Sequence, residues 1–202
     1  YDLYAYATNK YGEITCKTVH FVVDITPPNL TINSPNTGYY QSKTIAIELS
    51  SEEGTLIWYR ILEIDENNQT YLAGHYRTIN DGNYTLIAYS QDVAGNIAVR
   101  NVTFVIDTVP PSITIVQPVE TISNNSTVTI EILSDDGGEH ILYYISPIDS
   151  GNSSYNGVIS RSLYDGDFII HVFCSDLAGN SNHTSYNFTC LLYTSDAADE
   201  LD

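Results

Sequence analysis

Basic side chains are scarce in this sequence. Its 202 residues include seven Lys and Arg against 25 Asp and Glu, which gives a formal net charge of −18 at pH 7. A chain this acidic repels the phosphates of nucleic acids and the headgroups of anionic membranes. We therefore expect no nucleic-acid partner, and we expect most of the acidic surface to be solvated.

Long apolar runs and methionine are absent. Because no stretch of 18 or more apolar residues is present, we expect no membrane insertion in this fragment. The first residues also lack the basic and apolar segments of a signal peptide. The sequence begins inside a strand pattern and without Met, so we expect that any signal peptide or anchor was lost with the missing ends.

Signatures of catalysis are absent as well. The sequence contains no nucleophile elbow, phosphate-binding loop, dinucleotide-binding loop or zinc signature. The five histidines are dispersed and show no metal-ligand spacing: His20, His75, His140, His171 and His183. We predict that the chain is not an enzyme and has no cofactor, with calcium as the one candidate ion.

The residues that are abundant favour β-structure. Seventeen Tyr accompany many Ile, Val and Thr, and hydrophobic residues make up 43% of the chain. β-branched and aromatic side chains suit a pleated, half-buried surface better than a helix. The composition predicts an all-β protein with enough apolar residues for packed cores.

The sequence repeats itself with a period of 83 to 84 residues. Residues 84–111 align without gaps on residues 1–28, which places Asp107 on Asp24, and a third copy begins at Phe168. We expect four segments: the last two strands of a truncated domain (1–26), a complete domain (27–109), a nearly complete domain (110–189), and a tail (190–202).

Each period contains about seven short β-prone runs separated by Gly, Pro, Asn or Asp, which is typical of a β-sandwich. In the middle copy these runs are residues 29–33, 43–50, 55–63, 69–72, 76–79, 83–92 and 97–106. Alternation along the sixth run predicts a core face and a partly wet face. The predicted core face carries Tyr84, Leu86, Ala88 and Ser90, matched in the third copy by Phe168, Ile170, Val172 and Cys174.

Tyr84 and the cysteines support two specific expectations. Tyr84 is placed to form a tyrosine corner, in which the hydroxyl returns to upstream backbone, whereas Phe168 cannot make that bond. Cys16 and Cys174 belong to different repeats, so we expect no inter-sheet disulfide. Cys174 is expected to be a small buried residue in place of Ser90.

Short motifs recur in register along the chain. They are the turns Asp92–Asn96 (DVAGN) and Asp176–Asn180 (DLAGN), and the joints Asp24–Pro28 (DITPP) and Asp107–Pro111 (DTVPP). With these motifs, residues 1 to 189 resemble the bacterial and archaeal immunoglobulin-like (Ig-like) domains found in tandem in surface proteins. The first copy departs from the pattern, with TNKYGE at residues 8–13.

The resemblance implies tandem antiparallel β-sandwiches in an extracellular or cell-surface protein. It also implies a structural or interaction role, as a spacer stalk or an adhesin array. The partners would be neighbouring domains of the same chain, and another surface protein or a polysaccharide. The Pro-Pro joints are expected to be short and stiff, because proline fixes φ and restricts the residue before it.

Four aspartates are weak candidates for a calcium site. A strand of about ten residues spans roughly 33 Å, so each Asp-x-Ala-Gly-Asn turn should face the joint that precedes its domain. Asp24 could then converge with the Asp92 turn, and Asp107 with the Asp176 turn. Two carboxylates fall short of the six to eight oxygens that Ca²⁺ prefers, and the alternative is a purely structural turn.

Asn-x-Ser/Thr sequons exceed the number expected by chance. Nine are present where the composition predicts about three. The excess indicates glycosylated surfaces and export, although Asn and Thr are also common at β-edges. The candidate residues are Asn29, Asn68, Asn83, Asn101, Asn124, Asn125, Asn152, Asn182 and Asn187.

An alternative function is an accessory carbohydrate- or protein-binding domain of a large extracellular enzyme. Exposed aromatic side chains such as Trp58 or Tyr89 would then contact the polysaccharide. We expect instead that Trp58 is the buried Trp of the third strand, as in many Ig-like domains.

The tail departs from the strand pattern. Residues 190–200 read CLLYTSDAADE, and ordinary codons for this segment reproduce a transposase adapter used in shotgun sequencing. We expect residues 190–202 to be an adapter artefact and not a domain, the alternative being a polar linker.

Overall fold

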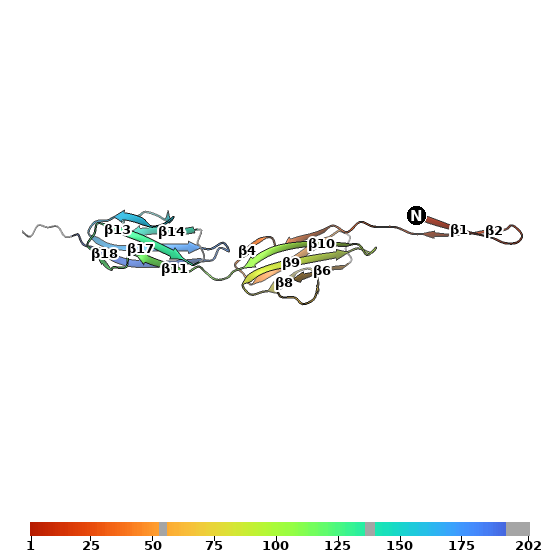
Figure 1. Ribbon diagram of the computed structural model, residues 1–202, viewed down its shortest axis with the longest axis horizontal. Coiled ribbons are helices and arrows are strands. Elements are labelled where there is room, and N and C mark those ends of the chain that lie inside the picture. Colours follow the sequence, from red (N-terminus) through yellow and green to blue (C-terminus); the bar gives the residue numbers. More distant parts are fainter. Residues whose placement is uncertain (53–55, 136–139, 193–202) are drawn as a thin grey trace, which may run out of the picture. The chain divides into compact units, whose positions relative to one another are not determined.

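The computed structural model describes residues 1–52, 56–135 and 140–192, and every regular element in these ranges is a β-strand (Figure 1). The chain divides into two compact units, one of residues 1–38 and 44–105 and one that contains residues 39–43 and the chain from Ile106 onward. The first residues form a hairpin of β1 (Asp2–Thr8) and β2 (Ile14–His20). The side chains of both hairpin strands are exposed.

The middle repeat is a sandwich of two β-sheets. One sheet has the order β3-β5-β8, and the other has the order β4-β10-β9-β6-β7. The strands are β3 (Leu30–Ser34), β4 (Gly38–Tyr40), β5 (Thr44–Ser51), β6 (Leu56–Ile61), β7 (Gln69–Thr70), β8 (His75–Thr78), β9 (Gly82–Gln91) and β10 (Ile97–Ile106).

The third repeat has the same strand order. Its sheets are β11-β13-β16 and β12-β18-β17-β14-β15, with β12 parallel to β18. The strands are β11 (Ile113–Gln117), β12 (Ile122–Ser123), β13 (Thr127–Ser134), β14 (His140–Ser146), β15 (Ser153–Ser154), β16 (Ile159–Ser162), β17 (Gly166–Ser175) and β18 (Ser181–Cys190).

The predicted core faces are confirmed. Tyr84, Leu86, Ala88 and Ser90 on β9 are buried, as are Phe168, Ile170, Val172 and Cys174 on β17. The opposite face of β9 is half-buried, as expected. The Cys174 thiol lies 3.5 Å from the Ser134 hydroxyl, and Ser90 makes the matching 2.8 Å contact with Ser51. Cys174 therefore replaces Ser90 as a small buried residue.

The tyrosine corner is confirmed in the middle repeat. The Tyr84 hydroxyl donates to the Asn80 carbonyl oxygen at 2.9 Å. Gly82 makes room for this ring, because a Cβ at that position would lie 3.2 Å from the Tyr84 hydroxyl. Its φ of +155° is also unfavourable for other residues. In the third repeat Phe168 packs against Phe188 in the core instead.

Each sandwich contains a partly buried ion pair that the sequence did not suggest. Arg77 donates to the Asp65 carboxylate at 2.7 Å in the middle repeat, and Arg161 donates to Asp149 at 2.6 Å in the third. Asp65 also accepts the backbone N–H of Ile61 at 2.9 Å. The hydrogen bond that each arginine donates to its aspartate raises the pKa of the arginine. The ion pair joins the loop after β6 to β8 in the middle repeat, and the loop after β14 to β16 in the third.

Three details differ from the sequence-based expectations. Short strands β4 and β12, which pair with the last strand of each sandwich, were not predicted. Most of the predicted strand ends are displaced by one or two residues. β18 extends to Cys190, one residue past the expected domain end at 189, and buries this residue where the middle repeat has Ile106. Residues 193–202 of the tail lie outside the described residues, and its origin from an adapter stays a prediction.

Candidate functional site

The Asp-x-Ala-Gly-Asn turn joins the last two strands of each repeat. In the middle repeat the backbone N–H of Asp92 donates to the Asn96 carbonyl at 3.1 Å, and Gly95 donates to the Asp92 carbonyl at 3.3 Å. Gly95 has a φ of +97°, in the left-handed region that glycine adopts at least cost. This geometry explains why the turn needs glycine at its fourth position.

The Asp92 carboxylate holds the turn closed. It accepts the backbone N–H of Asn96 at 2.8 Å and the Asn96 side-chain amide at 2.9 Å. These hydrogen bonds, the side-chain amide first, lower the pKa of Asp92 although its burial acts in the opposite direction. The aspartate therefore stays ionised at neutral pH and orients Asn96.

Asn96 connects the turn to the linker that precedes its domain. Its amide nitrogen, Nδ2, also donates to the backbone carbonyl of Asp24 at 3.1 Å. Asp24 is the first residue of the Asp24–Pro28 linker, and its own carboxylate accepts the N–H of Thr26 at 3.0 Å. We call the turn and this contact the linker clamp.

The third repeat reproduces the linker clamp. Asn180 donates to the Asp107 carbonyl and to the Asp176 carboxylate, both at 2.9 Å. The Asp107 carboxylate accepts the N–H of Val109 at 3.1 Å, as Asp24 accepts that of Thr26. A further bond from Asn182 to the carbonyl of Pro111, at 2.9 Å, ties the far end of the same linker. Each turn therefore contacts the joint that precedes its domain, through an asparagine side chain and a backbone carbonyl.

The first hairpin has a similar turn, in which Gly12 donates to the Asn9 carbonyl at 3.0 Å. Asn9 takes the place of the aspartate and accepts the N–H groups of Tyr11 and Glu13 at 2.9 and 3.1 Å. Glu13 takes the place of the clamping asparagine. An ionised glutamate has no N–H to donate to a carbonyl, so this turn cannot hold a linker in the same way.

The four candidate calcium ligands lie in two pairs, one at each linker clamp. Asp92 is 5% exposed, and the other three are half-buried. Each of the four carboxylates already accepts at least one N–H. Among the described residues, no group of three or more His, Cys, Asp or Glu is arranged to hold a metal ion. Calcium binding at the clamps stays a prediction.

The prediction that Trp58 is buried is wrong. Tyr59 occupies the core with 0% exposure, and Trp58 is half-buried on the outer face of the five-stranded sheet. There Trp58 stacks on Tyr89, with ring centroids 5.7 Å apart and 9° between the planes. Arg60 shares this outer face, because side chains alternate along β6.

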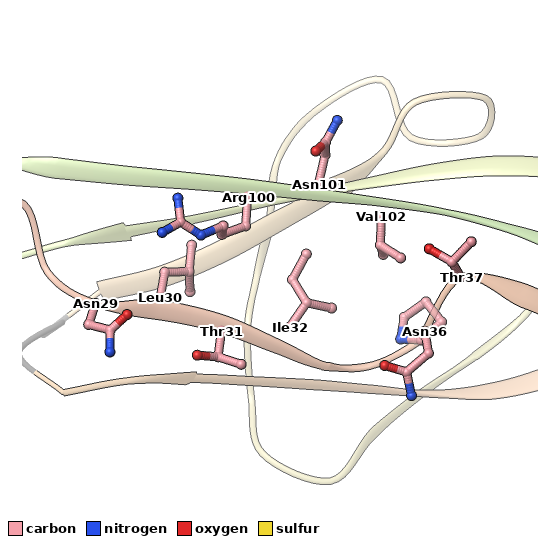
Figure 2. A pocket seen from close by; sticks show the side chains of 10 residues that line it. Asn29, Leu30, Thr31, Ile32, Asn36, Thr37, Arg100, Asn101 and Val102 are labelled. Carbon is pink, nitrogen blue, oxygen red and sulfur yellow. The ribbon is translucent and has the colours of Figure 1, made fainter.

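A polar groove of about 400 Å³ lies along one open side of the middle sandwich (Figure 2). Thr31 lies on β3, Asn29 and Asn36 lie in the segments before and after it, and Arg100 and Val102 come from β10. Figure 2 shows Val102 pointing toward Ile32 while Asn101 points away from the groove. The lining contains amides, hydroxyls, one guanidinium and apolar groups, without His, Cys, Asp or Glu.

All nine sequon asparagines carry exposed side chains. Asn29 and Asn101 flank the groove of Figure 2. The amide nitrogen of Asn182, the atom that a glycan would modify, donates to the Pro111 carbonyl at 2.9 Å, whereas that of Asn29 makes a longer bond of 3.4 Å to the Glu52 carboxylate. We therefore expect Asn182 to be a poor acceptor.

The described residues form no helix that is long and apolar enough to cross a membrane. Two sandwiches with identical strand order, joined by a short Pro-Pro linker, define a tandem array of Ig-like domains. In the five-stranded sheets, β6, β9 and β10 are neighbours, as are β14, β17 and β18. The third, sixth and seventh strands of an Ig-like domain pair in the same way.

Known structures with similar folds include domain arrays. The chain is similar to fibronectin(III)-like modules of Clostridium thermocellum CbhA, with 15% identity over 81% of this chain and 94% of that chain and a TM-score of 0.46. It is also similar to a tetra-tandem repeat in the extending region of a large adhesion protein, with 15% identity over 94% of this chain and a TM-score of 0.37. A Ca²⁺-stabilized adhesin of an Antarctic bacterium gives 18% identity over 95% of this chain and a TM-score of 0.36.

The chain spans 56% and 57% of the lengths of the two adhesion proteins. No protein-family model and no curated protein matches the sequence. All three TM-scores lie below 0.5, so the fold assignment rests on the strand order and pairing described above.

Proposed function

We propose that this chain is a structural and interaction module of a secreted or cell-surface protein, in which Ig-like domains act as a spacer stalk or an adhesin array. The observation that carries the proposal is the linker clamp, which occurs with the same hydrogen bonds in both sandwiches. Hydrogen bonds that hold each domain to the preceding linker limit how neighbouring domains can move, which is the property that a spacer needs.

The clamp and the prolines act together on the linker. Pro110 and Pro111 fix φ and restrict the residue before each of them. Asn180 and Asn182 hold the carbonyls of Asp107 and Pro111, which lie at the two ends of the linker. Each bond removes conformations that a free linker would sample, so the linker is stiffer than its length alone would make it.

Excess sequons and the high negative charge support an extracellular location. Nine exposed acceptor asparagines suit a surface that carries glycans, and a net charge of −18 keeps a long array soluble. The groove of Figure 2 offers no general acid or base, because its lining has no His, Cys, Asp or Glu.

Spin-label distance measurements test the spacer role. One label is placed in each sandwich, and the distance distribution is recorded for the native chain and for Asn180→Ala. We expect a broader distance distribution in the variant. The free energy of unfolding of the third repeat should fall by only about 1 kcal/mol, because one hydrogen bond is lost. Asn187→Ala, an exposed asparagine of the same repeat, is the matched control. An unchanged distribution in Asn180→Ala would refute a stiffening role.

The second candidate function is an accessory binding domain of a large extracellular enzyme. It is favoured by the half-buried Trp58–Tyr89 pair on an outer sheet face. Binding of the native chain to a polysaccharide array, lost in Trp58→Ala, would support this function. Retention of binding in that variant would exclude the aromatic pair as its site.

A further inference from the structure

The loop between β15 and β16 of the third repeat contains the one Asn-Gly pair of the sequence, Asn156–Gly157. Both residues are exposed. Neither the Asn156 side chain nor the Gly157 backbone N–H makes a hydrogen bond to another described residue. Asn156 is followed by Gly-Val, so it is not a sequon and lies outside the set of glycosylation candidates.

An asparagine side chain can react with the backbone nitrogen of the residue that follows it. Here the nitrogen of Gly157 would attack Cγ of Asn156, so that an N–Cγ bond forms and the Cγ–Nδ2 bond breaks. Nδ2 leaves as ammonia and takes up the proton of the Gly157 amide. The product is a cyclic succinimide, which water opens at either carbonyl to give aspartate or isoaspartate. Because both reacting groups belong to adjacent residues, the ring closure is unimolecular and needs no enzyme or oxidant.

The structure leaves the attacking nitrogen accessible. A side chain on the following residue would crowd the nitrogen, and glycine has none. Outside its chain neighbours, no described atom lies within 4 Å of the Cβ position of Gly157, so the loop is open at this point. Gly157 has a φ of +129°, a conformation that glycine reaches at little cost. The backbone can therefore rotate toward the ring geometry without breaking a hydrogen bond or meeting a neighbour.

Comparable positions of the chain lack one of these features. Gly95 and Gly179 donate their N–H groups to the carbonyl of the aspartate that opens each turn. Asn152 is also exposed, but the next residue, Ser153, has a side chain and pairs with β14. A reactive pair, solvent exposure and an unbonded glycine nitrogen coincide at Asn156–Gly157.

We propose that Asn156 is a site of spontaneous deamidation, at which the third repeat acquires aspartate and isoaspartate with time. The inference goes beyond the spacer role, because it concerns a covalent change within one domain and not the spacing of domains. Each event also exchanges a neutral amide for a carboxylate, which adds to the negative charge of the chain.

The change would act on the residue that holds this loop to the sandwich. The Tyr155 N–H donates to the Ile141 carbonyl at 2.8 Å, and its hydroxyl accepts the N–H of Ile132 at 3.0 Å. Its ring also packs against the core. Isoaspartate inserts a methylene group into the backbone directly after Tyr155, so these contacts should weaken. The equivalent Tyr71 of the middle repeat is followed by Leu72, so that repeat is spared.

Peptide mapping of the full chain after incubation in mildly alkaline buffer tests the proposal, because the attacking nitrogen must lose its proton. Mass spectrometry locates each deamidated asparagine, and an isoaspartate-specific methyltransferase detects the rearranged product. We expect deamidation at Asn156 to be several-fold faster than at Asn152, with isoaspartate among the products. Gly157→Ala should slow the reaction at Asn156 several-fold, whereas Asn152→Gln, the matched control, should leave it unchanged.

Thermal melting of the incubated chain tests the structural consequence. The transition of the third repeat, seen by circular dichroism, should move to lower temperature, while the Trp58 fluorescence midpoint of the middle repeat stays constant. Asn156→Gln incubated in parallel should keep its melting temperature, which separates deamidation at this residue from other damage.

Three results would count against the proposal. An Asn156 that keeps its amide while Asn152 loses its own overturns it. Deamidation that Gly157→Ala does not slow also overturns it, because the nitrogen of residue 157 is then not the attacking group. A third repeat that contains isoaspartate and melts like the fresh chain overturns the role given to Tyr155.

Discussion

Substitution of Asp65 by alanine is the sharpest test of how the middle sandwich is held together. The change removes the carboxylate that accepts Arg77 at 2.7 Å and the backbone N–H of Ile61 at 2.9 Å. The Asp65 side chain is 5% exposed and that of Arg77 is 22% exposed, so water replaces these partners only in part. The variant therefore leaves a guanidinium and a buried amide without their acceptor.

The expected loss of stability follows from these contacts. Breaking a buried ion pair by removing one partner costs about 3 to 5 kcal/mol. Arg77 keeps a 3.2 Å contact with the Tyr59 hydroxyl, which favours the lower end of that range. A loss of about 3 kcal/mol corresponds to a decrease of about 15 °C in the melting temperature of a domain of this size. Replacing both partners by leucine should cost much less, because no charge is then left unpaired.

Tryptophan fluorescence isolates the affected repeat, because Trp58 is the only Trp of the chain and lies in the middle sandwich. Asp65→Ala should lower the midpoint observed by fluorescence. The matched variant Asp149→Ala breaks the equivalent pair with Arg161 in the third repeat. It should lower the melting transition of that repeat, seen by circular dichroism, and leave the fluorescence midpoint of the middle repeat unchanged. A loss below about 1 kcal/mol in Asp65→Ala would show that solvent supports Arg77 and would refute the reasoning.

Four further predictions concern other parts of the chain. Tyr84→Phe should cost about 1 kcal/mol through the lost bond to the Asn80 carbonyl, and fluorescence-monitored urea unfolding will detect it. Because the folded pKa of Asp92 is lowered, its contribution to stability is present above about pH 4 and is lost as the pH falls through the folded value; Asp92→Asn lacks this contribution at every pH, so its acid unfolding, followed by circular dichroism, should occur at a higher pH than that of the native chain. Calcium should raise the melting temperature and chelator should lower it, and an unchanged midpoint with both would rule out calcium at the clamps. In a host that glycosylates asparagine, glycosidase treatment should reduce the mass of the chain, while peptide mapping should find Asn182 unmodified.

The sandwich and its core were predictable from the sequence because their signals are local. Alternation along a strand has a period of two, so the run from Tyr84 to Ser90 identified its buried face without any knowledge of the partner strands. Recurrence of the same pattern about 83 residues later predicted that each period forms its own sandwich. The tyrosine corner followed from the position of Tyr84 at the start of that strand.

Trp58 shows where alternation fails. Both faces of β6 carry large apolar side chains, so the pattern alone did not decide whether Trp58 or Tyr59 faces the core. Arg60 on the same face as Trp58 was the available signal, because a charged side chain is rarely buried without a partner. Short strands such as β4 were missed because three residues carry too little pattern to stand out.

The sequence by itself determined the all-β class, the repeat and the core faces, since each depends on residues that are neighbours along the chain. Only the tertiary structure decided which distant groups meet: Asn96 with a carbonyl 72 residues away, Arg77 with Asp65, and His171 with His183. Such contacts depend on strand order and register, which place polar groups from separate strands within hydrogen-bond distance and which no local periodicity encodes.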